Sequence, residues 1–312
     1  MKFHLAIIGG GLTGTSLLCQ FLRKVRRSAE RADLKTDGIR ISVFEKQNVF
    51  GPGFPHSDRY VLPYHITNMC DRDMGILAER PTDFQEWAES HLNLVQDFFH
   101  EPDTLIGWPD PPHDRCRHYP RAVMGEYLKA RFREALESAR SLGIQVELFP
   151  RVEVTDLKEE SHLVRMTARR LSDGERLIAS ANRVLLATGH WFEEAAREGY
   201  FSSPWPARKL LRDIPPGERV GVIGTSLSAI EAALTLTSDG TFQRRADGEL
   251  IFLPADNSRI IALYSRRGMI PKVRGRTGRY RNRFLTRENL EESRRADRGW
   301  LRLDSIFRLL SA

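Results

Sequence analysis

The sequence predicts an α/β protein built around two strand–turn–helix units, and three features of its 312 residues support this. An apolar run over residues 3–8 leads directly into a glycine-rich turn and a helical pattern. A second apolar run, over residues 220–223, leads into a similar turn and helix. Between them, residues 182–189 read NRVLLATG, which is typical of a buried strand ending at a small-residue turn. Strands that alternate with helices indicate a largely parallel sheet with helices on its faces.

The first turn has the spacing G-x-G-x-x-G, formed by Gly9, Gly11 and Gly14. Gly9 permits a tight turn, Gly11 lets the backbone approach a pyrophosphate, and Gly14 lets the helix pack closely on the strand. The start of the helix then offers free N–H groups and a partial positive charge to phosphates. The pattern therefore predicts a Rossmann-like dinucleotide-binding unit at the start of the chain, the alternative being a glycine turn that holds no ligand.

A second strand is predicted at residues 39–45, and it ends in Glu45, whose carboxylate suits the hydroxyls of a ribose. Glu45 follows Gly14 by 31 residues, whereas about 20 is usual. The extra residues are polar and charged, so we expect a longer first helix followed by a surface loop.

The second unit has Gly224, Ser226 and Ala229 at the glycine positions of the motif. Small residues can replace glycine where the backbone approaches a little less closely. The next predicted strand, residues 259–264, is followed by Arg266 and Arg267 rather than by an acid. Arginine at this point favours the 2′-phosphate of NADP over NAD, so NADP(H) is the predicted nucleotide. The alternative is that both arginines are solvated charges at the end of a strand.

Further motifs give the chain a resemblance to a known family. Residues 51–57 read GPGFPHS, residues 65–68 read HITN, and residues 187–190 read ATGH. These runs resemble elements of bacterial FAD/NAD(P)-binding proteins, which are relatives of N-hydroxylating and other single-component flavin monooxygenases. The resemblance spans roughly residues 3–272. Its other matching positions are Met74, Asp83, Phe84, Trp87, Pro120, Arg121, Gly125, Tyr127, Leu128 and Ser265–Gly268.

The resemblance implies a flavoprotein with two dinucleotide-binding domains. We expect an FAD domain over residues 1–205, with an inserted helical and loop region at about 81–118, and an NAD(P)-binding unit over 206–312. The FAD contacts that the resemblance implies come from Gly9, Gly11, Gly14, Glu45, Asn68, Arg121 and Thr188. Gly51, Gly53 and Gly189 are expected to add backbone to the same site. Arg121 could equally be a surface arginine, and Asn68 could merely cap the loop backbone.

No catalytic triad is evident, as expected where a flavin carries the chemistry. His190, next to the turn after residues 182–186, is a weak candidate for an acid–base residue, and His56 and His65 follow it. Each is also interpretable as a structural histidine. Three widely spaced cysteines form no C-x-x-C pair, and no metal site is predicted.

The formal charge of +7 is concentrated near the end of the chain. Residues 265–302 contain thirteen Lys or Arg against four Asp or Glu. The run Lys272–Arg283 could bind RNA through phosphates and stacking, but we favour a role near NADP phosphates or an acidic substrate.

The leading hypothesis is an FAD-dependent oxidoreductase that accepts hydride from NADPH and acts on a small molecule, with monooxygenation favoured by the resemblance. A second hypothesis is a flavin- or nucleotide-binding sensor or partner-binding protein without turnover, and RNA binding is a third. The cysteine pattern and the start of the chain predict a cytoplasmic protein without a membrane span. The chain stops soon after the second unit, so we expect either a shortened chain or an incomplete sequence.

Overall fold

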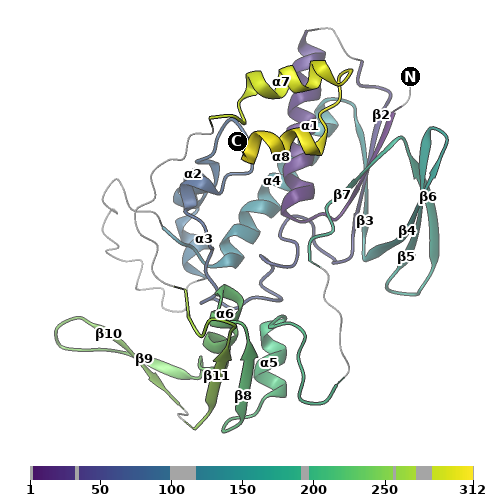
Figure 1. Ribbon diagram of the computed structural model, residues 1–312. Coiled ribbons are helices and arrows are strands. Elements are labelled where there is room, and N and C mark those ends of the chain that lie inside the picture. Colours follow the sequence, from purple (N-terminus) through teal and green to yellow (C-terminus); the bar gives the residue numbers. More distant parts are fainter. Residues whose placement is uncertain are drawn as a thin grey trace. The chain divides into compact units, whose positions relative to one another are not determined.

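The computed structural model describes residues 3–31, 35–98, 117–190, 197–255, 258–271 and 283–311. The chain forms two compact units, Met1–Met269 and Ile270–Ala312. The predicted α/β class with a parallel sheet is confirmed in the larger unit (Figure 1). The predicted domain boundary at residue 205 stays a prediction.

A four-stranded parallel sheet forms the centre of the larger unit, with the order β3-β2-β1-β7. Its central strand β1 is almost wholly apolar and is buried from Leu5 to Ile8, as a strand with neighbours on both sides requires. The chain moves to one side of β1 for β2 and β3 and returns to the other side for β7. The strands are β1 Phe3–Ile8, β2 Ile39–Glu45, β3 Gln145–Pro150 and β7 Arg183–Leu186.

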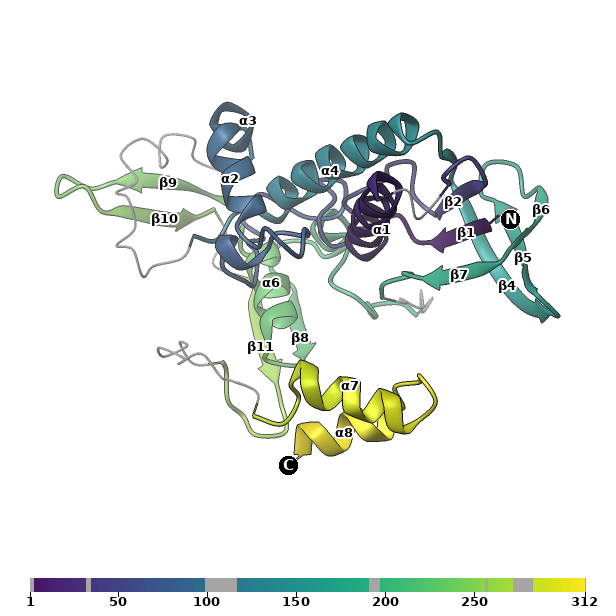
Figure 2. The same ribbon diagram turned by 90° about the horizontal axis from the view of Figure 1, so that it is seen from above.

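Two long helices cover one face of this sheet, α1 (Leu12–Glu30) and α4 (Arg121–Ser141). Figure 2 shows them side by side. In α1 the buried side chains Leu18, Leu22 and Val25 recur at helical spacing and face the core. The shorter elements that pack on this layer are η1 Asp71–Asp73, α2 Asp83–Ser90 and α3 Leu92–Gln96.

A three-stranded antiparallel sheet covers the opposite face of the parallel sheet (Figure 1). Met166, Ala168 and Ala181 turn inwards against Ala6 and Ile8 of β1, whereas most other side chains of the three strands are exposed. The strands, in the order β4-β5-β6, are β4 Val152–Glu160, β5 Leu163–Arg170 and β6 Arg176–Ala181.

The second strand–turn–helix unit is built on a parallel pair, β8 (Arg219–Ile223) and β11 (Ile260–Tyr264). Leu210, Ala232 and Leu236 form its small core. The remaining elements of this unit are α5 Ala207–Asp213, α6 Leu227–Leu236 and the hairpin of β9 Gly240–Arg244 with β10 Leu250–Pro254.

The described part of the smaller unit contains two helices, α7 (Arg287–Ala296) and α8 (Leu303–Ser311). Thr286 caps α7 by accepting a hydrogen bond from the Asn289 N–H. The arginine-rich run 272–282 lies outside the described residues, and so does most of the predicted insertion, residues 99–116. Over the part of the chain that is described, no helix is long and apolar enough to cross a bilayer.

Candidate functional site

The first glycine turn lies at the carboxyl edge of the parallel sheet, where β1, β2 and β7 end together. The Gly9 N–H donates to the Phe44 carbonyl at the end of β2, and the Ala187 N–H donates to the Ile8 carbonyl at the end of β1. Because the chain leaves β1 on one side and returns on the other, this edge is a topological switch point. Open α/β sheets bind their ligands at such points.

Gly9 and Gly14 are required by close packing. Gly9 has φ +106°, and a Cβ there would lie 2.1 Å from the Ala187 carbonyl oxygen. A Cβ at Gly14 would lie 2.0 Å from the Gly9 carbonyl oxygen, because α1 passes directly over the turn. No side chain larger than hydrogen fits at either position without displacing backbone.

Gly11 is different, because its φ of −77° suits any residue. A Cβ at Gly11 would lie 3.1 Å from the Gly53 Cα, so the loop of residues 51–57 runs past the start of α1. Gly51 and Gly53 both have positive φ, and the Gly51 N–H donates to the Gly10 carbonyl. Two stretches of backbone that lack side chains thus face each other at the predicted phosphate position.

The amino end of α1 carries no side-chain cap and no acid in its first turn, and Leu12 and Thr13 are exposed there. The first N–H groups of a helix have no partner within it. This donor set and the glycine cradle fit a dinucleotide diphosphate.

Glu45 is buried beside this turn. Its Oε2 accepts a hydrogen bond of 2.7 Å from the Gly10 N–H, and its Oε1 accepts one of 2.8 Å from the Gln47 N–H. Burial raises the pKa of Glu45, and these backbone donors oppose the rise. Each carboxylate oxygen can accept a second hydrogen bond, so the group can still receive ribose hydroxyls.

Thr188, Gly189 and His190 follow β7 at the same edge and are exposed. Gly189 has φ +69°, and a Cβ there would meet nothing within 4 Å. The structure therefore brings these residues to the edge that carries Gly9 and Glu45.

Arg121 and Asn68 lie together in a different setting from the glycine turn. The Arg121 guanidinium donates to the Asn68 side chain at 3.3 Å and to the Ile66 carbonyl at 3.1 Å. It also forms an ion pair of 2.5 Å with Glu231 of α6 and lies over the Trp205 ring. Arg121 is therefore a buried residue with protein partners.

His65 is held as a neutral histidine. Its Nδ1 accepts from the Leu62 N–H, so its Nε2 carries the proton and donates to Thr235 Oγ1 at 3.0 Å. Thr235 in turn donates to the Glu231 carbonyl. Burial, with Arg121 nearby, lowers the pKa of both His65 and His56 to about 4. These directions agree with structural histidines rather than with acid–base groups at neutral pH.

The second turn has the same hydrogen bond as the first, because the Gly224 N–H donates to the Tyr264 carbonyl at the end of β11. Ser226 is the N-cap residue of α6 and makes no side-chain cap, and Ala229 is buried in the helix. Arg266 and Arg267 are exposed just beyond β11. Thr225 Oγ1 donates to the Met269 carbonyl, which brings the arginine turn back to the glycine turn.

Glu231 and Thr235 were not predicted from the sequence. The available signal was the helical pattern of α6, in which positions 231 and 235 lie one turn apart on one face. Their partners Arg121 and His65 are more than a hundred residues away in the chain, so no local pattern identifies the contact.

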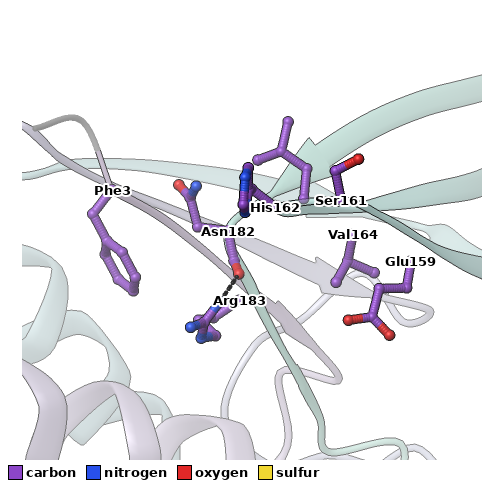
Figure 3. A pocket seen from close by; sticks show the side chains of 8 residues that line it. Phe3, Glu159, Ser161, His162, Val164, Asn182 and Arg183 are labelled. Carbon is purple, nitrogen blue, oxygen red and sulfur yellow. Dashed lines mark hydrogen bonds between the residues drawn. The ribbon is translucent and has the colours of Figure 1, made fainter.

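A hollow of about 610 Å³ lies near the opposite edge of the sheet, by the start of β1. Figure 3 shows Asn182 and Arg183 beside the β4–β5 turn, with Arg183 donating to the Asn182 carbonyl. None of the predicted site residues lines this hollow. Among the described residues no group of three or more potential metal ligands occurs. The hollow is lined by Phe3, Glu159, Ser161, His162, Leu163, Val164, Asn182 and Arg183.

The fold and the glycine turn define a dinucleotide-binding α/β protein. Comparison with known proteins gives the family: residues 6–191 match the family described as FAD-NAD(P)-binding, and the chain belongs to it. The predicted resemblance is confirmed.

The chain is 27% identical over 275 residues to the uncharacterized protein YdhS of Escherichia coli (strain K12), a match that covers 86% of this chain and 46% of the relative. The chain thus spans about half the length of that relative. Among solved structures it is similar to ornithine hydroxylase (PvdA) of Pseudomonas aeruginosa, at 16% identity and a TM-score of 0.46, over 76% of this chain and 52% of that one. It is also similar to bacillithiol disulfide reductase Bdr (YpdA) of Bacillus cereus, at 17% identity and a TM-score of 0.39, over 84% and 77%.

Proposed function

We propose that the chain binds FAD at the first glycine turn and a nicotinamide dinucleotide at the second, and that it acts as an FAD-dependent oxidoreductase. The observation that carries the proposal is the amino end of α1, which has no side-chain cap and no acid in its first turn. Its first N–H groups have no partner within the helix, and Gly11, Gly51 and Gly53 place backbone without side chains beside them. A dinucleotide diphosphate is a ligand that such main-chain donors suit.

Bound FAD would accept a hydride from the reduced nicotinamide and pass its electrons to an acceptor. The chain's own residues would bind and orient the FAD. The first N–H groups of α1 would hold the diphosphate, Glu45 would accept the ribose hydroxyls, and the backbone at Thr188 and Gly189 would border the cofactor at the same edge.

NADPH is the nucleotide we favour at the second turn. Arg266 and Arg267 follow β11 without an accompanying acid, and the Thr225–Met269 hydrogen bond holds their turn near Gly224. A guanidinium at this position suits a 2′-phosphate, whereas a carboxylate would repel it.

We further propose a small-molecule substrate and a monooxygenase-type reaction, both on the basis of the family resemblance. Oxygen consumption that depends on NADPH, with an oxygenated product, is the test of that part. A location in a reducing cytoplasm accords with three cysteines that form no C-x-x-C pair.

The test of the proposal is anaerobic mixing of the FAD-loaded protein with NADPH. If the protein is an oxidoreductase, NADPH reduces the flavin and its visible absorption disappears. NADH is expected to reduce the flavin more slowly. A sensor or partner-binding protein, the second candidate, stays yellow with NADPH but bleaches with dithionite. That candidate is favoured by Ser226 and Ala229 in place of glycines, and the dithionite control separates it from a protein with an inaccessible flavin.

A further inference from the structure

A buried polar seam connects α6 to the loop and helix that carry Asn68 and Arg121. We use "seam" for two contacts: the Arg121–Glu231 ion pair of 2.5 Å and the His65–Thr235 hydrogen bond of 3.0 Å. The two side chains of the ion pair are only 10% and 9% exposed. Since Glu231 and Thr235 are one helical turn apart, one face of α6 makes both contacts.

A buried ion pair contributes little net free energy to holding two elements together. Desolvating two charges offsets much of their attraction, and a well-packed apolar pair holds as firmly. A buried ion pair is best attested as a device that fixes register and position. In Arg121–Glu231 the guanidinium is also bound by the Asn68 side chain and the Ile66 carbonyl, so its orientation is set on both sides.

Only one of the two carboxylate oxygens of Glu231 has a partner in this arrangement. Its Oε1 bonds Arg121, but its Oε2 is buried and has no hydrogen-bond partner among the described residues. Burial raises the pKa of Glu231, and Arg121 opposes the rise. A buried carboxylate kept in this state is costly, and its cost indicates a role other than stability.

The seam lies between the elements that carry the two proposed nucleotide sites. On one side, α6 begins at Leu227, directly after the Gly224 turn. On the other, Arg121 starts α4, and α4 packs on the loop that also reaches Gly11. A Cβ at Gly125 of α4 would lie 2.1 Å from the His56 carbonyl oxygen, so that loop and α4 are in close contact.

Hydride transfer requires the nicotinamide and flavin rings to be held at near-contact distance, and an error of about 1 Å costs about a hundredfold in rate. We propose that Glu231 is a positioning residue for this transfer: acting through Arg121, it fixes α6 against the loop and helix beside the flavin site. This inference rests on the proposed function, and it gives Glu231 no contact with the reacting atoms.

Two substitutions and one control test the inference. Glu231→Gln keeps the shape and one acceptor for Arg121 but removes the charge. Thr235→Val keeps the volume but removes the partner of His65. Glu249→Gln is the matched control, because Glu249 pairs with Arg245 at 2.7 Å where both side chains are more than half exposed.

We expect Glu231→Gln to bind FAD normally and to be bleached fully by dithionite, while its flavin reduction rate at saturating NADPH falls about tenfold or more. Its Kd for NADP⁺ should stay within about threefold of wild type, because the binding turn is intact. Thr235→Val should show a smaller loss, and Glu249→Gln none. A general loss of structure would instead lower FAD content and alter the Kd.

Hydrogen exchange on the FAD-loaded protein gives a second readout without turnover. Faster exchange in Glu231→Gln is expected both in α6 and at residues 65–68, and not in the control. An unchanged rate at saturating NADPH in Glu231→Gln, with a wild type that NADPH reduces, overturns the inference alone. A wild type that takes up FAD but is not reduced by NADPH overturns the oxidoreductase proposal and this role with it.

Discussion

The two glycine turns share one design but differ in how tightly they are enclosed. In each, the first glycine has positive φ, +106° at Gly9 and +125° at Gly224. In each, its N–H donates to the carbonyl at the end of the next parallel strand, Phe44 or Tyr264. A Cβ at Gly9 would strike the Ala187 carbonyl at 2.1 Å, whereas one at Gly224 would meet nothing within 4 Å.

The number of neighbouring strands explains the difference. β1 lies between β2 and β7, so the turn after it is closed on both sides. β8 pairs with β11 alone in the described sheet, and Ile223 at its end is 91% exposed. A turn enclosed on both sides needs glycine at several positions, while an open turn tolerates Ser226 and Ala229. The strictness of the motif therefore reflects local packing as well as the ligand.

The largest contrast is expected between Gly9→Ala and Gly224→Ala. In both variants an alanine at positive φ is strained by about 1–3 kcal/mol. Only in Gly9→Ala does the added Cβ also clash with backbone, at the Ala187 carbonyl. We expect Gly9→Ala to lower the free energy of unfolding by more than about 4 kcal/mol and Gly224→Ala by the strain alone. Urea unfolding measures both. Equal losses would remove the packing explanation.

Acid should lower the stability of the larger unit through its two buried histidines. The folded pKa of His65 and His56 is about 4, below the ordinary 6.5, so the unfolded chain binds protons first as pH falls. The contribution of these histidines to stability is then fully present above about pH 6.5 and is lost between about pH 6.5 and 4, by at most about 1.4 kcal/mol per pH unit for each histidine. Unfolding free energies at several pH values test this: His65→Gln should show a shallower slope, and an identical slope would contradict the assignment.

The nucleotide preference of the second turn tests its proposed role. Replacing Arg266 and Arg267 together by alanine should narrow the preference for NADPH over NADH by about tenfold or more, since a charge-assisted hydrogen bond contributes about 1.5–3 kcal/mol. The ratio of kcat/KM for the two nucleotides measures it. If the ratio does not change, both arginines are solvated charges.

The smallest effect is expected for Ala229→Gly, which restores the third glycine of the motif in the open second turn. Glycine within a helix costs about 1 kcal/mol relative to alanine, and no closer approach of backbone is gained. A Tm that rises instead would show that the second turn is as crowded as the first.

The sequence predicted those parts of the fold whose signals are local. The strands over residues 3–8 and 39–45 have the predicted bounds, because an apolar run bounded by glycine or a charge is unambiguous there. The sheet β4-β5-β6 was not predicted. Its strands carry runs such as KEE and RR on solvent-facing sides, and few positions, Met166 and Ala168 among them, face the core.

The same distinction applies to the site. Gly9, Gly14 and Glu45 could be predicted as site residues because the glycine spacing and the acid after the next strand lie within one βαβ unit, although the contact that requires glycine at position 9 comes from Ala187, far along the chain. Glu231 was missed, because its partner Arg121 is brought to it only by the tertiary fold. The resemblance predicted Arg121 as a cofactor contact, and only the tertiary structure shows its protein partners.

The central claim, FAD held by main-chain donors at the start of α1, is tested most directly by titrating cofactor-free protein with FAD. Wild type and Gly221→Val, whose Cβ would make an ordinary 3.4 Å contact with the Tyr264 ring, should both bind FAD and turn yellow. Gly11→Val should remain folded and fail to bind. A folded wild type that takes up no flavin, or a Gly11→Val protein that binds it as wild type does, would contradict the account.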